Sequence, residues 1–543
     1  MQAAAALPAA SAPAPPPRGW SALAAGLDGW LIRPADAGYD SARRLYNTRF
    51  DPLRPAAIAY VTGPGDIAEC LAFARRHATP VAVRNGGHSY GGWSSGNGRL
   101  VIDVSPLDQI ATAPDRPAPD GPGTVRPAPD RSGTGRPTPS RPGTLHSDTL
   151  HAGPLRPGPA GEATVGAGTK LATVYAALGA QGVTLPGGTC PSVGVSGLTL
   201  GGGHGVVSRA YGLTCDSLLS ATLVTADGRT LHCDPREHPA LFWALRGAGH
   251  GIFGVVTELR FRTHPAPAAA SARLAWPWTG AAAVLRAWQE WGPDLPDEIW
   301  SAAHLEAGSG SPPRVRVTVF SLGAYGELEN AVDRLVGRVG ARPSAVSLHR
   351  HSYGEAMTGY ARCAARPAEE CRLPGTTPGR HPSGAVRRET YAARSDFYDR
   401  PIADRGLTAL VAGVERFPGA SGTHGTRGMG GIDGSVTVHL TALGGAINRI
   451  APTATAFVHR RSRVLAQYMV NWPAGHGPSA PTAWLNGLYR AMRPYASGAA
   501  YQNYADPALE DWRRAYYGPA ADRLARVKHR YDPDRVFDHP QAV

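Results

Sequence analysis

Short apolar runs and amphipathic stretches alternate early in the chain, which predicts a mixture of strands and helices. Residues 58–61 form a compact apolar run typical of a buried strand. From Asp66 onward apolar side chains recur at helical spacing, so we predict a helix that Asp66 opens as its N-cap. The runs 81–84 and 100–104 predict two more strands.

The same mixture resumes after a polar gap. A helix is predicted around 170–182, and apolar runs at 218–225 and 230–233 flank an Asp-Gly pair, which is a hairpin signal. Residues 254–261 alternate between apolar and polar side chains as a half-buried strand does.

Beyond the His264-Pro265 boundary, strands such as 315–321 alternate with helices such as 326–339. This pattern predicts an antiparallel sheet covered by helices, and therefore an α+β fold. We divide the chain into an N-terminal extension 1–50 that is partly disordered, a unit 51–264, a second unit 265–475, and a helical C-terminal segment 476–543 that returns to the first unit.

Residues 113–160 interrupt the first unit with a ten-residue repeat. Arg-Pro-Ala-Pro-Asp begins at Arg116 and again at Arg126, and a variant begins at Arg136. The segment has almost no large apolar side chains, so burial cannot offset its chain entropy. We predict a disordered insertion, with a proline-rich docking element as the alternative.

The charge and hydrophobicity of the chain narrow the classes of binding partner that we expect. The net charge is +13, but basic residues are scattered, with no run longer than a pair such as Arg460-Arg461, which argues against nucleic acid. No apolar run is long enough to span a membrane. The first 20 residues lack a basic leader, so we expect a cytoplasmic protein and keep secretion open. The oligomeric state is left open.

Six cysteines are too few for a disulfide scaffold in a chain of 543 residues. Cys363 and Cys371 could close a small loop, and Cys215 and Cys233 could meet across a hairpin; neither pairing is decided by sequence. The cysteines and histidines show no C-x2-C or H-x3-H spacing, so no metal site is predicted.

Two glycine-dense segments each hold a reactive side chain. His88 lies within 84–92, and Cys190 lies within 187–205, where eight of nineteen residues are glycine. Such backbone can approach a planar or phosphorylated ligand closely. A nicotinamide-binding fingerprint is excluded, because Leu171 stands where the third glycine after Gly166 belongs.

Segments 84–92, 187–205 and 501–537 resemble the berberine-bridge-enzyme-like branch of the vanillyl-alcohol oxidase superfamily. The resemblance implies an FAD-binding domain of p-cresol-methylhydroxylase type in 51–264, a substrate domain in 265–475, and a berberine-like motif in 476–543. It also implies an FAD bonded twice, through His88 to the 8α-methyl carbon and through Cys190 to C6. A thiolate is needed at C6, and we expect the glycine loop to stabilise it.

The resemblance also implies the other site residues. Tyr501 is the expected base, provided that its neighbours lower a pKa that is about 10 in a free phenol. Gln467 is expected on a strand that reaches the substrate. Leu443 replaces an aromatic residue of many relatives. The expected flavin contacts are Arg84, Asn85, Gly86, Gly87, Ser89, Val193, Gly194, Gly197, Gly202, Gly203, Gly205, Val255, Asn503 and Tyr504.

The resemblance implies an FAD-dependent oxidase that removes hydride from an alcohol carbon of a sugar, an oligosaccharide or a glycosylated natural product. Val193 stands where relatives that react with O2 carry valine, so O2 is the expected second substrate and H2O2 the product. Oxidative ring closure in secondary metabolism and a flavin-binding protein without turnover are the alternatives.

Overall fold

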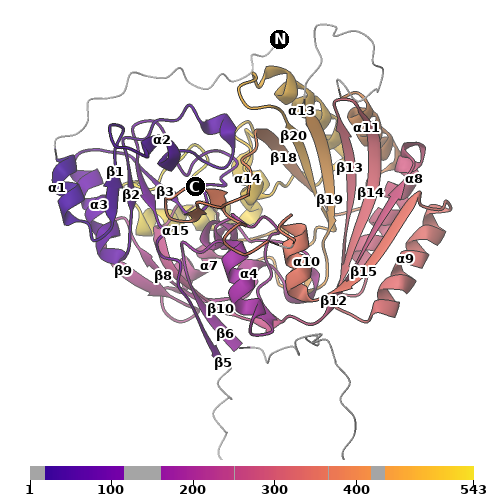
Figure 1. Cartoon of the computed structure of the whole chain (residues 1–543), viewed down its shortest axis with the longest axis horizontal. Helices are drawn as coiled ribbons and strands as arrows, with labels where there is room; N and C mark the ends of the chain where they lie inside the picture. Colours follow the sequence, from indigo (N-terminus) through magenta and orange to yellow (C-terminus); the bar gives the residue numbers. More distant parts are fainter. Residues whose placement is uncertain (1–18, 115–160, 250, 365, 418–433) are drawn as a thin grey trace, which may run out of the picture.

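The computed structural model describes residues 19–114, 161–249, 251–364, 366–417 and 434–543. Within these ranges the chain forms sheets of four, five and seven strands and two small two-stranded sheets. Figure 1 shows the first two sheets and their helices beside the seven-stranded sheet. The α+β class predicted from the sequence is confirmed.

The four-stranded sheet has the order β1-β2-β4-β3, and its last three strands are parallel. Helix α3 begins at Pro64 and not at Asp66, because the Asp66 carboxylate is used elsewhere: it accepts from the backbone of Asp28 at 2.7 Å and of Thr62 at 2.7 Å. The elements are α1 (Trp20–Gly26), β1 (Trp30–Ile32), α2 (Tyr39–Ala42), β2 (Ala57–Tyr60), α3 (Pro64–Arg76), β3 (Val81–Arg84) and β4 (Leu100–Asp103).

The predicted N-terminal extension is thus part of the fold from residue 19 onward, because β1 pairs with β2. Residues 1–18 lie outside the described part of the chain. So does the predicted insertion from residue 115 to 160, whereas its first two residues belong to a strand of the second sheet.

The five-stranded sheet is antiparallel, with the order β5-β6-β10-β8-β9. The predicted hairpin is confirmed, since β8 pairs with β9 across the Asp-Gly turn. The helices and strands of this part of the chain are β5 (Ile110–Pro114), β6 (Gly161–Gly166), α4 (Leu171–Gly179), β7 (Val183–Thr184), α5 (Val195–Leu200), α6 (Ser208–Tyr211), β8 (Leu218–Val224), β9 (Thr230–Cys233), α7 (Pro239–Leu245), β10 (Val255–Arg262) and β11 (His264–Pro265).

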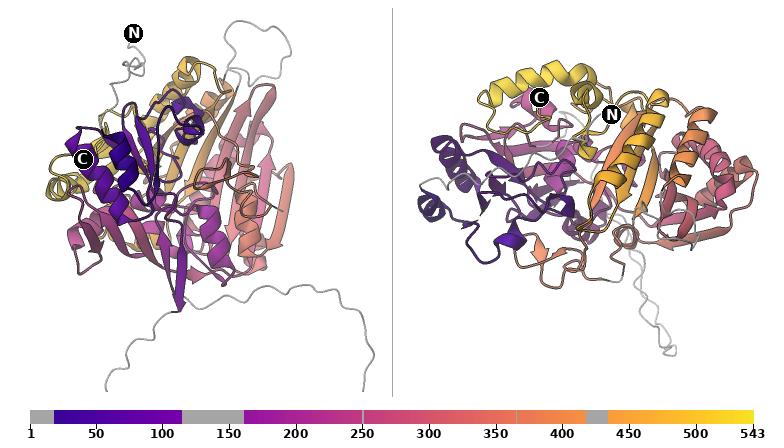
Figure 2. Two further views of the ribbon diagram at one scale, coloured as in Figure 1. Left: turned by 60° about the vertical axis from the view of Figure 1, so that its left-hand side comes forward. Right: turned by 90° about the horizontal axis from the view of Figure 1, so that it is seen from above.

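The seven-stranded sheet is antiparallel throughout, with the order β15-β12-β14-β13-β19-β20-β18. Helices α8, α9, α11 and α13 cover the face that points away from the first two sheets (Figures 1 and 2). The elements are β12 (Ala269–Trp276), α8 (Ala281–Trp291), β13 (Ile299–Gly308), β14 (Ser311–Ser321), α9 (Tyr325–Val339), β15 (Ala345–His351), α10 (Tyr353–Tyr360), β16 (Leu373–Pro374), β17 (Arg380–His381), β18 (Tyr391–Tyr398), α11 (Asp404–Glu415), β19 (Ser435–Ala442), α12 (Ala446–Arg449), β20 (Val464–Asn471) and α13 (Ser479–Met492).

The chain crosses back to the first two sheets after α13. That helix lies in the predicted C-terminal segment, yet Leu485 and Leu488 pack in the core of the seven-stranded sheet. The later helices α14 (Trp512–Tyr517) and α15 (Ala521–Tyr531) join the other core. Lys528 Nζ secures them by donating to Ile252 O at 2.6 Å.

Of the two cysteine pairings left open, the structure contains one. Cys363 and Cys371 form a disulfide with Cα atoms 5.8 Å apart, whereas Cys215 and Cys233 are free and buried. Among the described residues, no helix is both long and apolar enough to cross a membrane. The same residues include no cluster of three His, Cys, Asp or Glu placed to hold a metal ion.

Candidate active site

A cavity of about 1100 Å³ lies between the glycine loops and the sheet face that the helices leave uncovered. Its volume is slightly above the usual range for small-molecule sites, roughly 300–1,000 Å³, so one cavity has room for a large ligand with a second beside it. His88 and Cys190 both line it, at one end, and strands β13, β14, β19 and β20 line the other.

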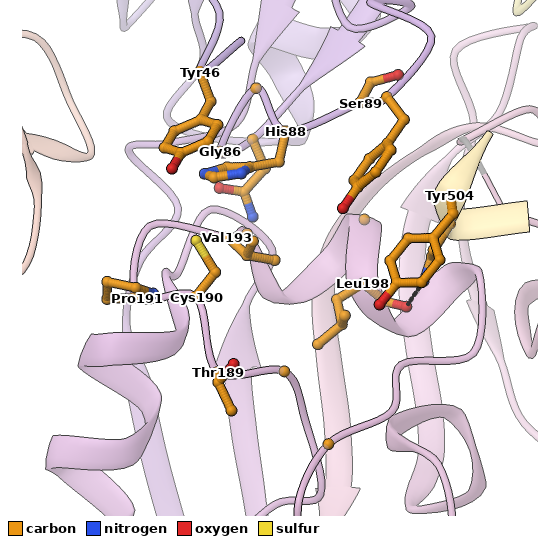
Figure 3. Close-up of a pocket in the computed structure, with 18 of the residues that line it drawn as sticks. Tyr46, Gly86, His88, Ser89, Thr189, Cys190, Pro191, Val193, Leu198 and Tyr504 are labelled. Carbon is orange, nitrogen blue, oxygen red and sulfur yellow. Dashed lines mark hydrogen bonds between the residues drawn. The ribbon is translucent and has the colours of Figure 1, made fainter. Parts of the chain in front are cut away.

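His88 and Cys190 approach each other through Ser192. Ser192 Oγ lies 2.9 Å from His88 Nε2 and 4.0 Å from Cys190 Sγ. The ring of Tyr46 stacks on the imidazole, with centroids 4.0 Å apart. Figure 3 shows the imidazole and the sulfur directed toward the same space, with Tyr46 on the other side of the imidazole. Two segments about a hundred residues apart thus bring a nitrogen and a sulfur together.

Glycine allows this approach because the two loops touch through their backbones. A Cβ on Gly86 would lie 2.5 Å from Ser192 O and 2.7 Å from Gly194 N. Lys170 braces the contact from behind: its buried Nζ donates to Gly168 O at 2.8 Å and to Ser105 Oγ at 3.1 Å, and it also donates to Asn85. These glycines therefore serve loop-to-loop packing.

Burial sets the charge of both reactive groups. It lowers the pKa of His88 to about 3, and nearby Lys170 lowers it further. It raises the pKa of Cys190 to about 11, although hydrogen bonds from Ser192 and Val193 act in the opposite direction. The expectation that the glycine loop stabilises a thiolate is therefore wrong for the protein alone, because desolvation outweighs the loop's hydrogen bonds. At neutral pH both groups are uncharged.

Tyr501 lies on the opposite wall, at the start of the short helix Gln502–Tyr504. Its hydroxyl accepts two hydrogen bonds, from Gly203 N at 2.9 Å and from Asn503 Nδ2 at 2.9 Å. Burial nevertheless raises its pKa, whereas the sequence led us to expect a lowered one. The reason is that no cation lies among the groups that shift it, so only the two N–H donors favour the phenolate.

Tyr504 pairs with a residue that the motifs did not single out as a site residue. Its hydroxyl lies 2.8 Å from His204 Nε2. Burial lowers the pKa of His204 to about 4, so this imidazole is neutral at pH 7.

A polar row crosses the floor of the cavity. Arg316, His304, His439 and Gln467 stand directly opposite one another on β14, β13, β19 and β20. The two histidines share a hydrogen bond between their Nδ1 atoms at 2.8 Å. Gln467 Nε2 donates to Tyr90 Oη at 2.8 Å, which links the row to the His88 loop. The predicted placement of Gln467 on a strand facing the site agrees with this geometry.

Several buried polar atoms on the wall have no hydrogen-bond partner among the described residues. Such atoms are costly to bury and usually mark the place of water or a ligand. They belong to both ends of the cavity: Ser94 Oγ, His204 Nδ1, Trp300 Nε1, His304 Nε2 and Tyr360 Oη. The cavity is therefore suited to a ligand with many polar groups.

Most predicted site residues meet at this cavity. Lining it are Tyr501, Gln467, His88, Cys190, Arg84, Asn85, Gly86, Gly87, Ser89, Val193, Gly194, Gly197, Gly205, Asn503 and Tyr504.

Three predicted flavin contacts do not line it. Val255 points into the core, because side chains alternate along β10 and its neighbour Val256 takes the wall position. Gly203 supports the wall by donating to Tyr501, and Gly202 packs against Phe457. Leu443 also lies behind the wall, in an apolar cluster that includes Tyr501.

The residues that sequence reasoning missed come mainly from strands. Trp300, His304 and Glu306 lie at alternate positions of β13 and all face the cavity. The alternate spacing of these residues can be read from the sequence. The sequence does not tell which face of the strand the helices cover. Tyr46 and Tyr391 carried no motif at all, although each packs near His88 or Tyr90.

Comparisons with known proteins agree with this geometry. A family model described as an FAD binding domain matches residues 55–118 and 158–234, and a second, described as berberine and berberine like, matches residues 500–543. An uncharacterized FAD-linked oxidoreductase of Bacillus subtilis, YgaK, is 28% identical, covering 95% of this chain and 97% of its own.

The chain is an FAD-linked oxidoreductase, and it is similar to berberine-bridge-enzyme-like proteins. A chitooligosaccharide oxidase of Gibberella zeae is 27% identical to it, covering 92% of this chain and 89% of its own. The solved structure of BBE-like 1 from Physcomitrella patens superposes with a TM-score of 0.75 at 25% identity, covering 96% of this chain and 98% of that one.

The cavity of this FAD-linked oxidoreductase fits the cofactor. It is large enough for FAD, and along the glycine loops it is bordered by Gly197 and Gly251, beside which an added Cβ would meet nothing closer than 3.8 Å. The unpartnered Ser94 Oγ and His204 Nδ1 offer polar contacts at the same end.

Proposed function

We propose that this FAD-linked oxidoreductase is an oxidase that removes hydride from an alcohol carbon of a sugar, an oligosaccharide or a glycosylated natural product. The observation that carries the proposal is the single cavity that joins His88, Cys190 and Tyr501 to a polar sheet face. Bound FAD supplies the hydride acceptor and passes the electrons to O2.

His88 and Cys190 hold the cofactor covalently in this proposal. The hydrogen bond of His88 engages Nε2, so Nδ1 is the nitrogen left for a bond to carbon. The low pKa of His88 supports the attachment, because a neutral imidazole keeps a lone pair for that bond.

Tyr501 takes the hydroxyl proton of the substrate. Gly203 N and Asn503 Nδ2 aim at its oxygen and stabilise negative charge there, as the donors of an oxyanion hole do. Because burial raises the pKa of Tyr501, these two donors decide how much of it can act as a base.

The polar row supports a polyhydroxylated substrate. Arg316, His304, His439 and Gln467 offer donors and acceptors side by side, and a site built to hydrogen-bond hydroxyl groups rejects analogues that lack them. The chitooligosaccharide oxidase of Gibberella zeae is consistent with such a substrate. Ring closure of an apolar alkaloid-like molecule would leave these polar groups unsatisfied.

Val193 lines the cavity three residues after Cys190, and its small side chain supports access of O2.

The test is a panel of mono- and oligosaccharides under air and under nitrogen. We expect bleaching of the flavin under nitrogen and one H2O2 per product under air. Bleaching with no peroxide would make the protein a dehydrogenase. Bleaching only by apolar phenolic or alkaloid substrates would favour ring closure, and no bleaching by any substrate would favour a binding protein.

A further inference from the structure

One buried hydroxyl stands between the two reactive atoms. Ser192 is 2% exposed, and its Oγ lies 2.9 Å from His88 Nε2 and 4.0 Å from Cys190 Sγ. Among the described residues, His88 and Cys190 are the side chains with which this hydroxyl makes polar contacts. Its backbone O meanwhile touches the Gly86 position, so the serine is held at the contact between the two loops.

We propose that Ser192 is a positioning residue for cofactor attachment and serves both covalent bonds with one hydroxyl. The inference rests on the proposed bicovalent FAD. It adds a residue to that function, because Ser192 itself forms no bond to the cofactor and is not needed for hydride removal.

Ser192 first selects the nitrogen of His88 that reacts. When Nε2–H donates to Ser192 Oγ, the lone pair of the neutral imidazole resides on Nδ1. Stacked Tyr46 keeps the ring plane fixed. As Nδ1 bonds to the 8α carbon, one methyl hydrogen is replaced, and the Nε2 proton leaves through Ser192.

Ser192 then assists the bond to Cys190, with the direction of its hydrogen bond to His88 reversed. Once Nδ1 carries carbon, Nε2 holds only a lone pair and accepts a hydrogen bond from Ser192 Oγ–H. Ser192 Oγ can then receive the thiol proton as the sulfur bonds to C6, where it replaces the C6 hydrogen. This route matters because burial disfavours a free thiolate.

The redox balance is the same for both bonds. Each bond takes one hydrogen from the protein group and one from the flavin, at the 8α-methyl carbon or at C6, and O2 is the acceptor of the two electrons released. Each attachment therefore consumes one O2 and releases one H2O2. The histidyl bond is expected first, because it creates the acceptor that the cysteinyl bond uses.

The experiment measures attachment and not turnover. Full-length protein with both tethers and its Cys190→Ala variant are each made with Ser192 or with Ser192→Ala, then incubated with FAD in air. Mass spectrometry of denatured samples gives the fraction of FAD adduct over time, and peptide mapping identifies its site. We expect Ser192→Ala to slow the His88 bond of the Cys190→Ala protein at least tenfold, and to slow by at least the same factor the formation of the Cys190 bond in the protein that keeps both tethers.

Two further variants, Ser192→Thr and Ser192→Val, control for a simple packing defect. Thr and Val have nearly the same shape, but only Thr has a hydroxyl. Ser192→Thr should form the adduct within about threefold of the parent, and Ser192→Val should behave like Ser192→Ala. Ser220→Ala is the control for losing a buried serine away from the cavity, and it should not alter attachment.

The pH dependence separates positioning from structure. Without Ser192 the thiol must ionise unaided, so raising the pH from 7 to 9 should restore formation of the Cys190 bond in the Ser192→Ala protein that keeps both tethers about tenfold or more. The His88 adduct should gain no such recovery, since its imidazole is already neutral.

Three outcomes overturn the inference. The inference fails when Ser192→Ala forms both bonds at the parent rate, when Ser192→Thr is as slow as Ser192→Val, or when the pH recovery is equal for the His88 and Cys190 bonds. A wild-type protein without covalent FAD would instead refute the bicovalent function itself, and the role of Ser192 with it.

Discussion

The two ends of the cavity are built by different means. At the tether end, His88 and Cys190 are positioned by loops that touch through glycine backbone, and burial leaves both groups uncharged. At the sheet end, His304, His439 and Gln467 are positioned by strand register, and their polar atoms point at one another or into open space. In the function we propose, the first end holds the cofactor by covalent bonds, whereas the second recognises the substrate by hydrogen bonds.

This contrast predicts that substitutions at the two ends fail in different ways. A change at the tether end should alter attachment or reactivity of the cofactor, whereas a change at the sheet end should alter selection of the substrate and leave covalent FAD intact.

The largest effect is expected for Tyr501→Phe, which lies between the two ends. Loss of a positioned base typically costs 10²–10⁴-fold, so flavin reduction under nitrogen should slow about 1,000-fold while covalent FAD is retained. Stopped-flow absorbance measures the rate. Tyr516→Phe removes a buried hydroxyl that accepts from Asp506 N, outside the cavity, and is the matched control. Reduction within tenfold of wild type would exclude Tyr501 as the base.

The pH dependence of the same step gives the next largest effect. Because burial raises the pKa of Tyr501, the phenolate is the minor form at neutral pH and its fraction grows tenfold for each pH unit. The reduction rate should therefore rise about 100-fold from pH 6 to pH 8 with no plateau. Asn503→Leu, which removes one N–H donor, should lower the whole profile. A flat profile in wild type would contradict the assignment.

Substitutions in the polar row should act on substrate selection. His439→Ala leaves His304 Nδ1 without its buried partner, and an unsatisfied buried polar group costs about 1–3 kcal/mol. We expect kcat/KM for the best sugar to fall about 10- to 100-fold, with normal FAD adduct mass. Gln467→Leu should do the same. Equal losses for hydroxyl-rich and hydroxyl-poor substrates would show that the row does not read hydroxyl groups.

Val193→Leu tests how the tether end of the cavity controls the reaction with O2. A larger side chain beside the two attachment residues should slow reoxidation by O2 about tenfold and leave the rate of reduction under nitrogen unchanged. Mixing reduced enzyme with O2 in a stopped-flow instrument measures it. Val256→Leu enlarges another wall position and controls for a general loss of space.

The smallest effect on activity is expected from opening the disulfide. Cys363→Ser with Cys371→Ser frees a short loop whose Arg366 and Glu370 line the cavity. Closing a loop of this size stabilises by about 2–3 kcal/mol in the chain-entropy model, so the unfolding midpoint should fall a few degrees. Calorimetry measures the midpoint, and kcat should stay within twofold. An unchanged midpoint would mean that the bond does not constrain the unfolded chain.

Local patterns were enough for much of this molecule. Glycine density around His88 and Cys190 is a backbone requirement that each segment expresses by itself, so both residues could be predicted from their own neighbours. The α+β class and the hairpin at 218–233 follow from side-chain periodicity, which needs no distant contact. The repeat in 113–160 likewise predicts an interruption in the fold, but residues 115–160 lie outside the described part of the chain.

Contacts between distant segments decided the rest. The charge of Cys190 and Tyr501 depends on how completely other segments exclude water, so both pKa shifts ran opposite to the sequence-based expectation. His304 and His439 became partners only because strands about 130 residues apart pair in one register. Periodicity shows that a strand has two faces, but only the packed structure decides which face is covered by helices and which is left open to bind.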